Sequence, residues 1–397
     1  MQYAPARSAA SGHLEDLSSF SGGRGAAAQP VLDLAAPRVY SPAPMGFSCG
    51  IVGLPNVGKS TLFNSLSTAK AEAANYAFCT IEPNVGVVPV PDERLKQLSV
   101  IYKTQREVPT TIQFVDIAGL VRGASKGEGL GNQFLSHIRE VDAVAHVVRC
   151  FEDENVVHVE GKVSPVDDIE TIHTELALKD MDTVNKRLDR ARRQSKGGDA
   201  VEKAAIVVCE ALAKHLDEGK PARSFKVDGE TETNILRDMQ LLTSKPVFYV
   251  ANVDEGSLGN LDANPHLTKL KAYAEAEGAK VIPICAQLEE QIAELEPADR
   301  PEFLESVGLK ERGLNSVIRT GYELLGLLTF LTAGEKECRA WTVRKGSTAP
   351  ECAGAIHSDF QRGFIKAEVI WWEDLIKYGS EAKCRDAGKL SIEGKEY

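Results

Sequence analysis

The sequence has no Cys-x-x-Cys pair, no apolar run long enough to span a membrane, and no excess of positive charge. Its eight cysteines are scattered over 397 residues, which argues against a zinc site and a disulfide framework and favours a reducing compartment. Apolar residues make up 43% of the chain, but they form no long continuous segment, so we expect no membrane partner. A formal net charge of −11 argues against a protein that coats nucleic acid indiscriminately, although it allows a local basic patch.

Residues 1–44 differ from the rest in being rich in Ala, Ser, Gly and Pro, with scattered arginines and no sustained period. This composition is typical of a transit peptide, which predicts import into a chloroplast or another organelle. Glu15, Asp16 and Asp33 are more acidic than such peptides usually are, so a disordered extension of a cytoplasmic protein is the alternative. Met45 is a candidate start of an unextended chain.

What the chain does contain is a complete phosphate-binding loop, Gly-Leu-Pro-Asn-Val-Gly-Lys-Ser, at residues 53–60. The glycines let backbone N–H groups turn toward phosphates, Lys59 reaches the β- and γ-phosphates, and the Ser60 hydroxyl ligates Mg²⁺. An apolar run at 49–53 predicts a strand before the loop, and residues 61–66 predict a helix after it. The nucleotide contacts expected from this segment are Asn56, Val57, Gly58, Lys59, Ser60 and Thr61. The sequence therefore predicts binding of a nucleoside triphosphate.

A second signature, Asp-Ile-Ala-Gly, closes the apolar run 111–116, and its Asp116 is expected to hold the Mg²⁺ shell. Thr80 is the candidate for the second protein ligand of Mg²⁺. Leu120 stands where Ras-like enzymes place the glutamine that orients water, so hydrolysis needs another group, a cation or a partner. Asn56 is our candidate for binding a monovalent cation such as K⁺ against the phosphates.

The base-recognition motif departs from that of GTPases. Asn252 follows the apolar run 246–252, but Val253 replaces the lysine of Asn-Lys-x-Asp and Glu255 replaces its aspartate. The carboxylate fork for guanine is not reproduced, and Asp254 lies one position too early to substitute for it. This favours ATP over GTP as substrate. The expected contacts with the nucleotide from this half are Asn252, Val253, Glu255 and Ala286, which follows the apolar run 281–285.

Strands separated by helices predict an α/β fold, a doubly wound sheet with its ligand at the carboxyl ends of the strands. Two amphipathic segments at 177–191 and 201–212, around Gly197-Gly198, predict an antiparallel helical arm inserted into this fold. The positions expected in its apolar seam are spaced three and four residues apart: Ala177, Met181, Val184, Leu188, Ala191, Val201, Ala205, Val208 and Leu212. Lys186, Arg190 and Arg193 share one face of its first helix, which is either solvated or in contact with a phosphate backbone. Short β-like runs, including 338–343 and 368–372, predict a small C-terminal domain.

Several long motifs closely resemble the Obg-like ATPase family, also called YchF, and its organellar branch in particular. They are residues 53–60, 75–86, 116–132, 252–255, 334–341 and 356–365, and the resemblance covers the chain from Met45 onward. The resemblance implies a P-loop ATPase domain, an inserted coiled-coil arm and a C-terminal TGS domain, an α+β domain rich in strands. The expected boundaries are an extension at 1–44, the ATPase domain at 45–165 and 240–321, the arm at 166–239, and the TGS domain at 322–397.

The resemblance also implies slow ATP hydrolysis and association with the ribosome, with the large subunit as its expected site, and it leaves RNA open as a partner. It matches His158, in a loop at 155–161, to the family's candidate for positioning the attacking water. The chain stops at Tyr397, where the family continues with a strand that closes the TGS sheet, so we expect this domain to be incomplete.

We therefore expect a monomeric, Mg²⁺-dependent ATPase that acts as a ribosome-associated nucleotide switch. One alternative is a GTPase of the same fold. Another is a binding module whose nucleotide only sets conformation, with negligible turnover. A third is an RNA adaptor in which the C-terminal domain and the basic arm are the functional parts.

Overall fold

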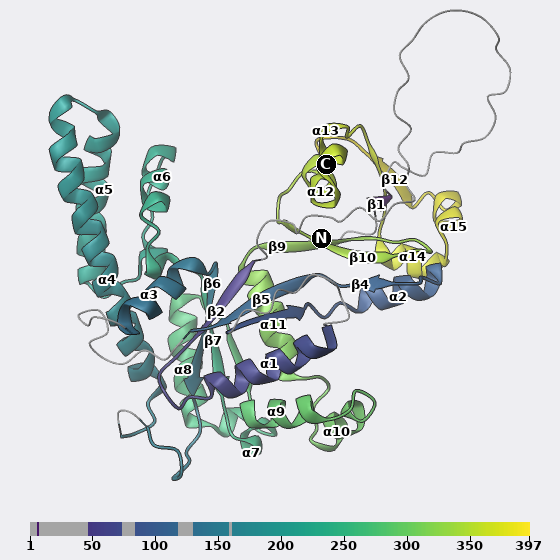
Figure 1. Ribbon diagram of the computed structural model, residues 1–397, viewed down its shortest axis with the longest axis horizontal. Coiled ribbons are helices and arrows are strands. Elements are labelled where there is room, and N and C mark those ends of the chain that lie inside the picture. The colour runs from purple at the N-terminus through teal and green to yellow at the C-terminus, as the bar shows by residue number, and fades with distance from the viewer. Residues whose placement is uncertain (1–5, 8–46, 74–83, 118–129, 159–160) are drawn as a thin grey trace, which may run out of the picture. The chain divides into compact units, whose positions relative to one another are not determined.

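The computed structural model describes residues 6–7, 47–73, 84–117, 130–158 and 161–397 (Figure 1). The chain divides into two compact units. The sheet unit comprises Gly46–Pro91 and Pro109–Leu327, and the C-terminal unit comprises Asp92–Val108 and Leu328–Tyr397 together with Ala6–Arg7. No helix among the described residues is both long enough and apolar enough to cross a membrane.

The sheet unit is built on a six-stranded sheet in the order β3-β5-β2-β6-β7-β8. Its strands are β2 (Ser48–Val52), β3 (Val85–Pro89), β5 (Thr111–Asp116), β6 (Ala143–Arg149), β7 (Val247–Asn252) and β8 (Val281–Ile284). Neighbouring strands are parallel except for β3 and β5, which are antiparallel. Every residue of β2, β6 and β7 is buried, as expected for parallel strands covered on both faces. The predicted doubly wound α/β fold is therefore confirmed.

Helices cover both faces of this sheet. Among those that contribute to the apolar cores on the sheet are α1 (Lys59–Ala73), α3 (Leu130–Glu140), α8 (Pro265–Glu277) and α11 (Gly313–Leu324). Three further helices, α7 (Glu255–Leu258), α9 (Ala286–Glu294) and α10 (Arg300–Ser306), share a smaller apolar core. Strand β7 shows the alternation, because Phe248 and Val250 belong to one apolar core while Tyr249 and Ala251 belong to another, in which α8 packs. Loops at the carboxyl ends of the strands are therefore held on a rigid support.

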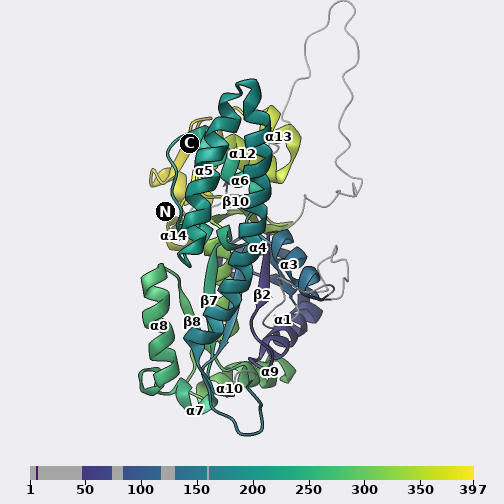
Figure 2. The ribbon, with the colours of Figure 1, turned by 90° about the vertical axis from the view of Figure 1, so that its left-hand side faces the viewer.

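The predicted helical arm is present. Helix α4 (Pro165–Gln194) and helix α5 (Ala200–Asp217) lie side by side, joined by a short turn in which Gly198 has a left-handed φ of 89° (Figure 2). The arm has its own apolar core, in which six of the positions predicted for its seam are buried: Val184, Leu188, Ala191, Ala205, Val208 and Leu212. Ala177 and Met181, predicted with them, are half-buried. Val201 was also predicted to lie in the seam, but it is 49% exposed because it sits in the first turn of α5. The chain returns through η2 (Ala222–Ser224), α6 (Glu230–Met239) and η3 (Leu242–Ser244).

The C-terminal unit contains two three-stranded sheets, β4-β10-β9 and β1-β11-β12. Its strands are β1 (Ala6–Arg7), β4 (Glu107–Val108), β9 (Leu327–Thr332), β10 (Cys338–Arg344), β11 (Ala367–Ile370) and β12 (Leu390–Glu393). Its helices are α2 (Glu93–Tyr102), α12 (Ala349–Ile356), α13 (Ser358–Arg362), α14 (Trp372–Tyr378) and α15 (Glu381–Asp386). The predicted strand at 368–372 ends at Ile370 instead, because Trp371 caps α14 and Trp372 begins it.

One segment lies in a different unit from the one expected. Residues Asp92–Val108, expected in the first part of the ATPase domain, belong to the C-terminal unit, because Leu95 and Leu98 of α2 pack against Leu331 and Leu375. Apart from this segment, the exact domain boundaries and the incompleteness of the last domain stay predictions.

Candidate functional site

The phosphate-binding loop runs from the end of β2 to the start of α1, as the sequence predicts. Gly53 and Gly58 have φ of 156° and 96°, and a Cβ at either position would meet a neighbouring atom at 2.5 Å or less. For Gly53 that atom is the carbonyl oxygen of Val147, and for Gly58 it is Nδ2 of Asn252. Both positions therefore require glycine for their backbone conformation and for close packing. Asn56, at the exposed tip, has a left-handed φ of 62°, which asparagine tolerates better than most residues.

Asn252, at the end of β7, joins two strand–helix turns. Its Nδ2 donates to the carbonyl oxygen of Val57 at 3.0 Å, and its Oδ1 accepts from the backbone N–H of Ala286 at 3.0 Å. The Asn252 side chain and the side chains of Val57 and Ala286 are all buried. The predicted nucleotide contacts from the two halves of the sequence are thus brought together by a single amide.

Lys59 and Asp116 form the charged centre of the site. Lys59 is buried, and its Nζ donates to the carbonyl oxygen of Leu54 at 2.7 Å. Burial lowers the pKa of Lys59 to about 8, although the Asp116 charge opposes this. Burial also raises the pKa of Asp116, and the Lys59 charge offsets only part of that increase. The site therefore holds an ammonium group that would gain from a nearby anion such as a phosphate.

The donor set fits a magnesium ion. Asp116 is the last residue of β5, and its Oδ1 is buried without a hydrogen-bond partner among the described residues. Ser60, the second residue of α1, is exposed, and Thr61 beside it is half-buried. A buried carboxylate oxygen without a donor is the kind of atom that a hard cation satisfies. The other predicted ligand, Thr80, and the predicted catalytic position Leu120 lie outside the described residues.

His158 lies in the loop that follows β6, and the structure places it away from solvent. Its Nε2 lies 3.1 Å from Oδ2 of Asp168, in the first turn of α4. The residue before it, Val157, accepts a hydrogen bond from Nδ2 of Asn56 at 3.1 Å. The histidine loop thus touches the tip of the phosphate-binding loop through its neighbour.

The segment expected to contact the base follows β7 and begins the short helix α7. Val253 is buried, whereas Asp254 and Glu255 are exposed at the start of α7. Asp254 is the N-cap of that helix, and it accepts from the backbone N–H of Ser257 at 2.9 Å and from its hydroxyl at 2.7 Å. Asp254 is therefore already engaged in capping, in addition to being out of register for a purine base.

Two residues near the site were missed by the sequence reasoning. Asp168 contacts His158, and Arg149 at the end of β6 is 1% exposed and bonds to three carbonyl groups of the histidine loop. For Arg149 the available signal was a charged residue at the end of a mostly apolar strand run, since such a side chain needs several partners when buried.

Family models match two segments of this chain. A family model described as a 50S ribosome-binding GTPase matches residues 48–186. The model named YchF-GTPase_C, described as a protein of unknown function, matches residues 327–397.

Curated relatives match over most of their length. The chain is 55% identical to the ribosome-binding ATPase YchF of Escherichia coli O157:H7 over 353 residues, covering 89% of this chain and 96% of the relative. It is 53% identical, with the same coverage, to the protein of that name from Bacillus subtilis strain 168. The solved structure of the Schizosaccharomyces pombe YchF GTPase superposes with a TM-score of 0.79 at 38% identity, covering 89% of this chain and 95% of that one.

Proposed function

The chain belongs to the YchF family, and on that premise we propose that it is a Mg²⁺-dependent ATPase that binds the ribosome and switches with its nucleotide. The observation that carries the proposal is the phosphate-binding loop, in which the Asn252 side chain bonds to Val57 and Ala286 and buried Lys59 donates to the Leu54 carbonyl. The relatives' names and the family model for ribosome-binding GTPases support the ribosome, and its large subunit in particular, as partner.

Each residue of the site has a role in this proposal. Lys59 exchanges the Leu54 carbonyl for the phosphates, and backbone N–H groups of the loop bind phosphate oxygens. Ser60 and Asp116 would hold Mg²⁺ with Thr80 and, when bound, the ion neutralises charge on the transferred phosphoryl group. The family resemblance places a hydrophobic residue at Leu120, which cannot orient the attacking water as a glutamine would. His158 is therefore our candidate for that role. The amide oxygen of Asn56 is a ligand suited to K⁺, and its Nδ2 already holds the histidine loop.

The names of the relatives do not agree on the preferred base, since one is called an ATPase and another a GTPase. Buried Val253 and capping Asp254 support ATP, because neither offers the carboxylate fork that guanine requires. The remaining candidate, Glu255, has a longer side chain than the aspartate of GTPases.

The test is a titration of the purified chain from Met45 onward with ATP and GTP in Mg²⁺, with either K⁺ or Na⁺, recording affinity and phosphate release. We expect tighter binding of ATP and slow release that is faster in K⁺. Tighter binding of GTP would contradict the role given to Val253 and Glu255. Binding of ATP without release, alone or with ribosomes, would favour the second candidate, a nucleotide-gated binding module.

Partners beyond ATP need their own measurement. The basic face of α4 at Lys186, Arg190 and Arg193 is exposed, which supports contact with RNA. Co-sedimentation with ribosomal subunits should show binding to the large subunit that weakens with salt and with charge removal on this face.

We also propose that the chain is a monomer, which light scattering would test. We propose further that residues 1–44 direct it to an organelle, which the location of a fluorescent fusion would test.

A further inference from the structure

The first part of the loop between β6 and α4, residues 150–158, is fixed at three points. At the first point, Nδ2 of Asn56 on the phosphate-binding loop donates to the carbonyl oxygen of Val157 at 3.1 Å. Asn56 itself is held in a left-handed conformation, so its side chain leaves the loop in a defined direction. The contact joins the loop that carries His158 to the loop that would bind phosphates.

The second point is Arg149, whose guanidinium is buried under the loop. Its Nε donates to the carbonyl oxygen of Phe151 at 3.0 Å, its Nη1 to that of Val156 at 2.9 Å, and its Nη2 to that of Asp153 at 3.2 Å. The guanidinium also lies over the Phe151 ring, 4.5 Å from its centroid. The planar guanidinium fork can bond to three separated carbonyl groups at once, which a lysine ammonium on its flexible stem cannot reproduce. One side chain therefore sets the path of six residues.

The third point is Asp168, which is 2% exposed and lies in the first turn of the long helix α4. Its Oδ2 lies 3.1 Å from Nε2 of His158. A carboxylate oxygen only accepts, so this bond requires the hydrogen on Nε2 and fixes the orientation of the ring. The end of the loop is thus attached to a rigid element.

We propose that Arg149 and Asp168 are positioning residues that hold the histidine loop against the phosphate-binding loop. The loop is then placed by side chains from β6 and α4, and His158 acts only when both anchors are intact. The catalytic consequence rests on the proposed ATPase function, whereas the placement of the loop does not. Loss of either anchor should slow phosphate release without weakening ATP binding, because neither residue belongs to the phosphate-binding loop.

Four variants separate this role from general destabilisation. Asp168→Ala removes the acceptor of His158, and Asp168→Asn restores an oxygen acceptor of nearly the same size. Asp167→Ala is the matched control, because Asp167 is the preceding residue, is exposed, and lies 3.8 Å from Lys162 in a solvated ion pair. Arg149→Lys keeps the charge and loses the fork.

Amide hydrogen exchange of residues 150–158 reads the placement of the loop directly. We expect exchange in D168A and R149K to rise by about tenfold or more, that in D168N to stay near wild type, and that in D167A to be unchanged. Phosphate release should fall about tenfold in D168A and R149K, with a dissociation constant for ATP within about threefold of wild type. Exchange that stays at the wild-type level in both anchor variants would overturn the proposal.

A double-mutant cycle with His158→Ala links the loop to the chemistry. D168A should reduce phosphate release strongly in the wild-type background and by less than about twofold in H158A, since both changes remove the same contribution. An equal reduction in both backgrounds would show that Asp168 acts through general stability. If H158A releases phosphate at the wild-type rate, the proposed role of His158 fails, and the exchange data alone decide whether the anchors position the loop.

Discussion

Asn252 serves the site through its packing, since both ends of its buried amide hold backbone groups of other loops. Replacing Asn252 with Ala would leave the Val57 carbonyl and the Ala286 N–H without these partners. We expect the free energy of unfolding to fall by about 2 to 4 kcal/mol, because two buried backbone groups lose their hydrogen bonds. Affinity for ATP should fall about tenfold or more, since the phosphate-binding loop is no longer held in place.

Urea denaturation and ATP titration would measure both effects. Asn260→Ala is the control, because Asn260 is exposed and its side chain makes no cap hydrogen bond at the turn that it precedes. An N252A protein that bound ATP as tightly as wild type would show that the amide does not shape the loop.

Lys59 gives the site a pH dependence of predictable sign. Its pKa is lowered to about 8 by burial, and bound phosphates would favour the charged form. Above pH 8 the free protein loses this proton, so binding must take up a proton and becomes weaker as the pH rises. We expect the dissociation constant for ATP to rise by about five- to tenfold between pH 8 and pH 9.

Calorimetric titrations in buffers of different ionisation enthalpy would detect the proton uptake. Lys59→Arg keeps a charge that does not titrate below about pH 12, so its affinity, even if lower, should be nearly flat across this range. A slope in K59R equal to that of the wild type would assign the effect to another group.

These residues also show how far a sequence predicts a site. Gly53, Gly58 and Lys59 could be assigned because the motif specifies a chemical task at each position. Arg149 and Asp168 could not, because their partners are backbone carbonyls and a ring that only the folded loop brings near. The roles of the site residues themselves stay predictions until they are measured.

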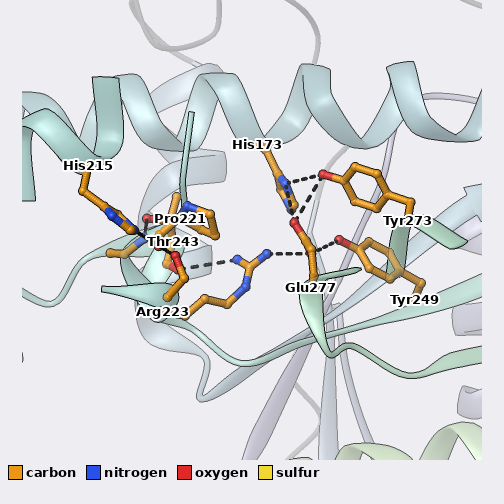
Figure 3. A network of polar contacts seen from close by, with 10 residues as sticks. His173, His215, Pro221, Arg223, Thr243, Tyr249, Tyr273 and Glu277 are labelled. Carbon is orange, nitrogen blue, oxygen red and sulfur yellow. Dashed lines mark hydrogen bonds and ion pairs between the residues drawn. The ribbon is translucent and has the colours of Figure 1, made fainter. Parts of the chain in front are cut away.

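At the scale of elements, α4 is held at the root of the arm by a polar network around Glu277 (Figure 3). Glu277 accepts hydrogen bonds from Tyr249 at 2.7 Å, Arg223 at 3.0 Å and Tyr273 at 3.3 Å, and it lies 3.7 Å from His173 of α4. Burial, and then the Arg223 charge, lower the pKa of His173 to about 4, so at neutral pH this histidine is uncharged. The network therefore joins α4 to β7, α8 and η2 around a single negative charge.

This charge predicts a loss of stability in acid. Burial alone would raise the pKa of Glu277, but the Tyr249 hydrogen bond and the Arg223 charge outweigh it, so the pKa lies below its usual 4.5. A lowered carboxyl pKa adds stability above about pH 4.5 that is lost as the pH falls through the folded-state pKa. Glu277→Gln should therefore lower the free energy of unfolding by about 1 to 3 kcal/mol at pH 7, with a smaller difference from wild type below pH 4.5.

Thermal denaturation of both proteins from pH 7 down to pH 3 would test this. Glu323→Gln is the matched control, since Glu323 forms an ion pair with Lys280 in which both side chains are more than half exposed. That change should alter the free energy of unfolding by less than about 0.5 kcal/mol at any pH. A constant difference between E277Q and wild type would show that the charge is not what stabilises the network.

The packing of an element was predictable from sequence where its partner lies nearby in the chain and shows a matching apolar pattern. The seam of the arm was visible because residues of α4 and α5 bury their apolar faces against each other, only a short turn apart. Helix α2 has an equally clear apolar face at Leu95 and Leu98, but amphipathicity does not say which core receives it. Its partners, Leu331 and Leu375, come more than 200 residues later in the chain, which is why the sequence alone did not group Asp92–Val108 with them.

At the scale of the whole molecule, the C-terminal unit includes residues 92–108, a segment that interrupts the sequence of the sheet unit. The chain leaves the sheet unit after Pro91 and returns at Pro109, and next to these residues the Val90 N–H donates to the Thr110 carbonyl at 2.8 Å. The residues that flank segment 92–108 are therefore held together by a hydrogen bond within the sheet unit itself. It follows that residues 92–108 can be removed without separating β3 from β5, which are paired directly.

This arrangement predicts how the sheet unit behaves when isolated. A chain of residues 46–327 retains α2 but lacks the C-terminal core. Leu95 and Leu98, which are only 4% and 0% exposed in the full chain, would then be exposed to solvent. We expect that chain to aggregate, because an uncovered apolar helix face associates with other copies. A second chain, in which a short Gly-Ser linker replaces residues 92–108, should remain monodisperse in size-exclusion chromatography and bind ATP within about threefold of the full chain. If both truncated chains were equally monodisperse, α2 would not depend on the C-terminal unit for its burial, and the two units would be separable at the sequence boundary near residue 327.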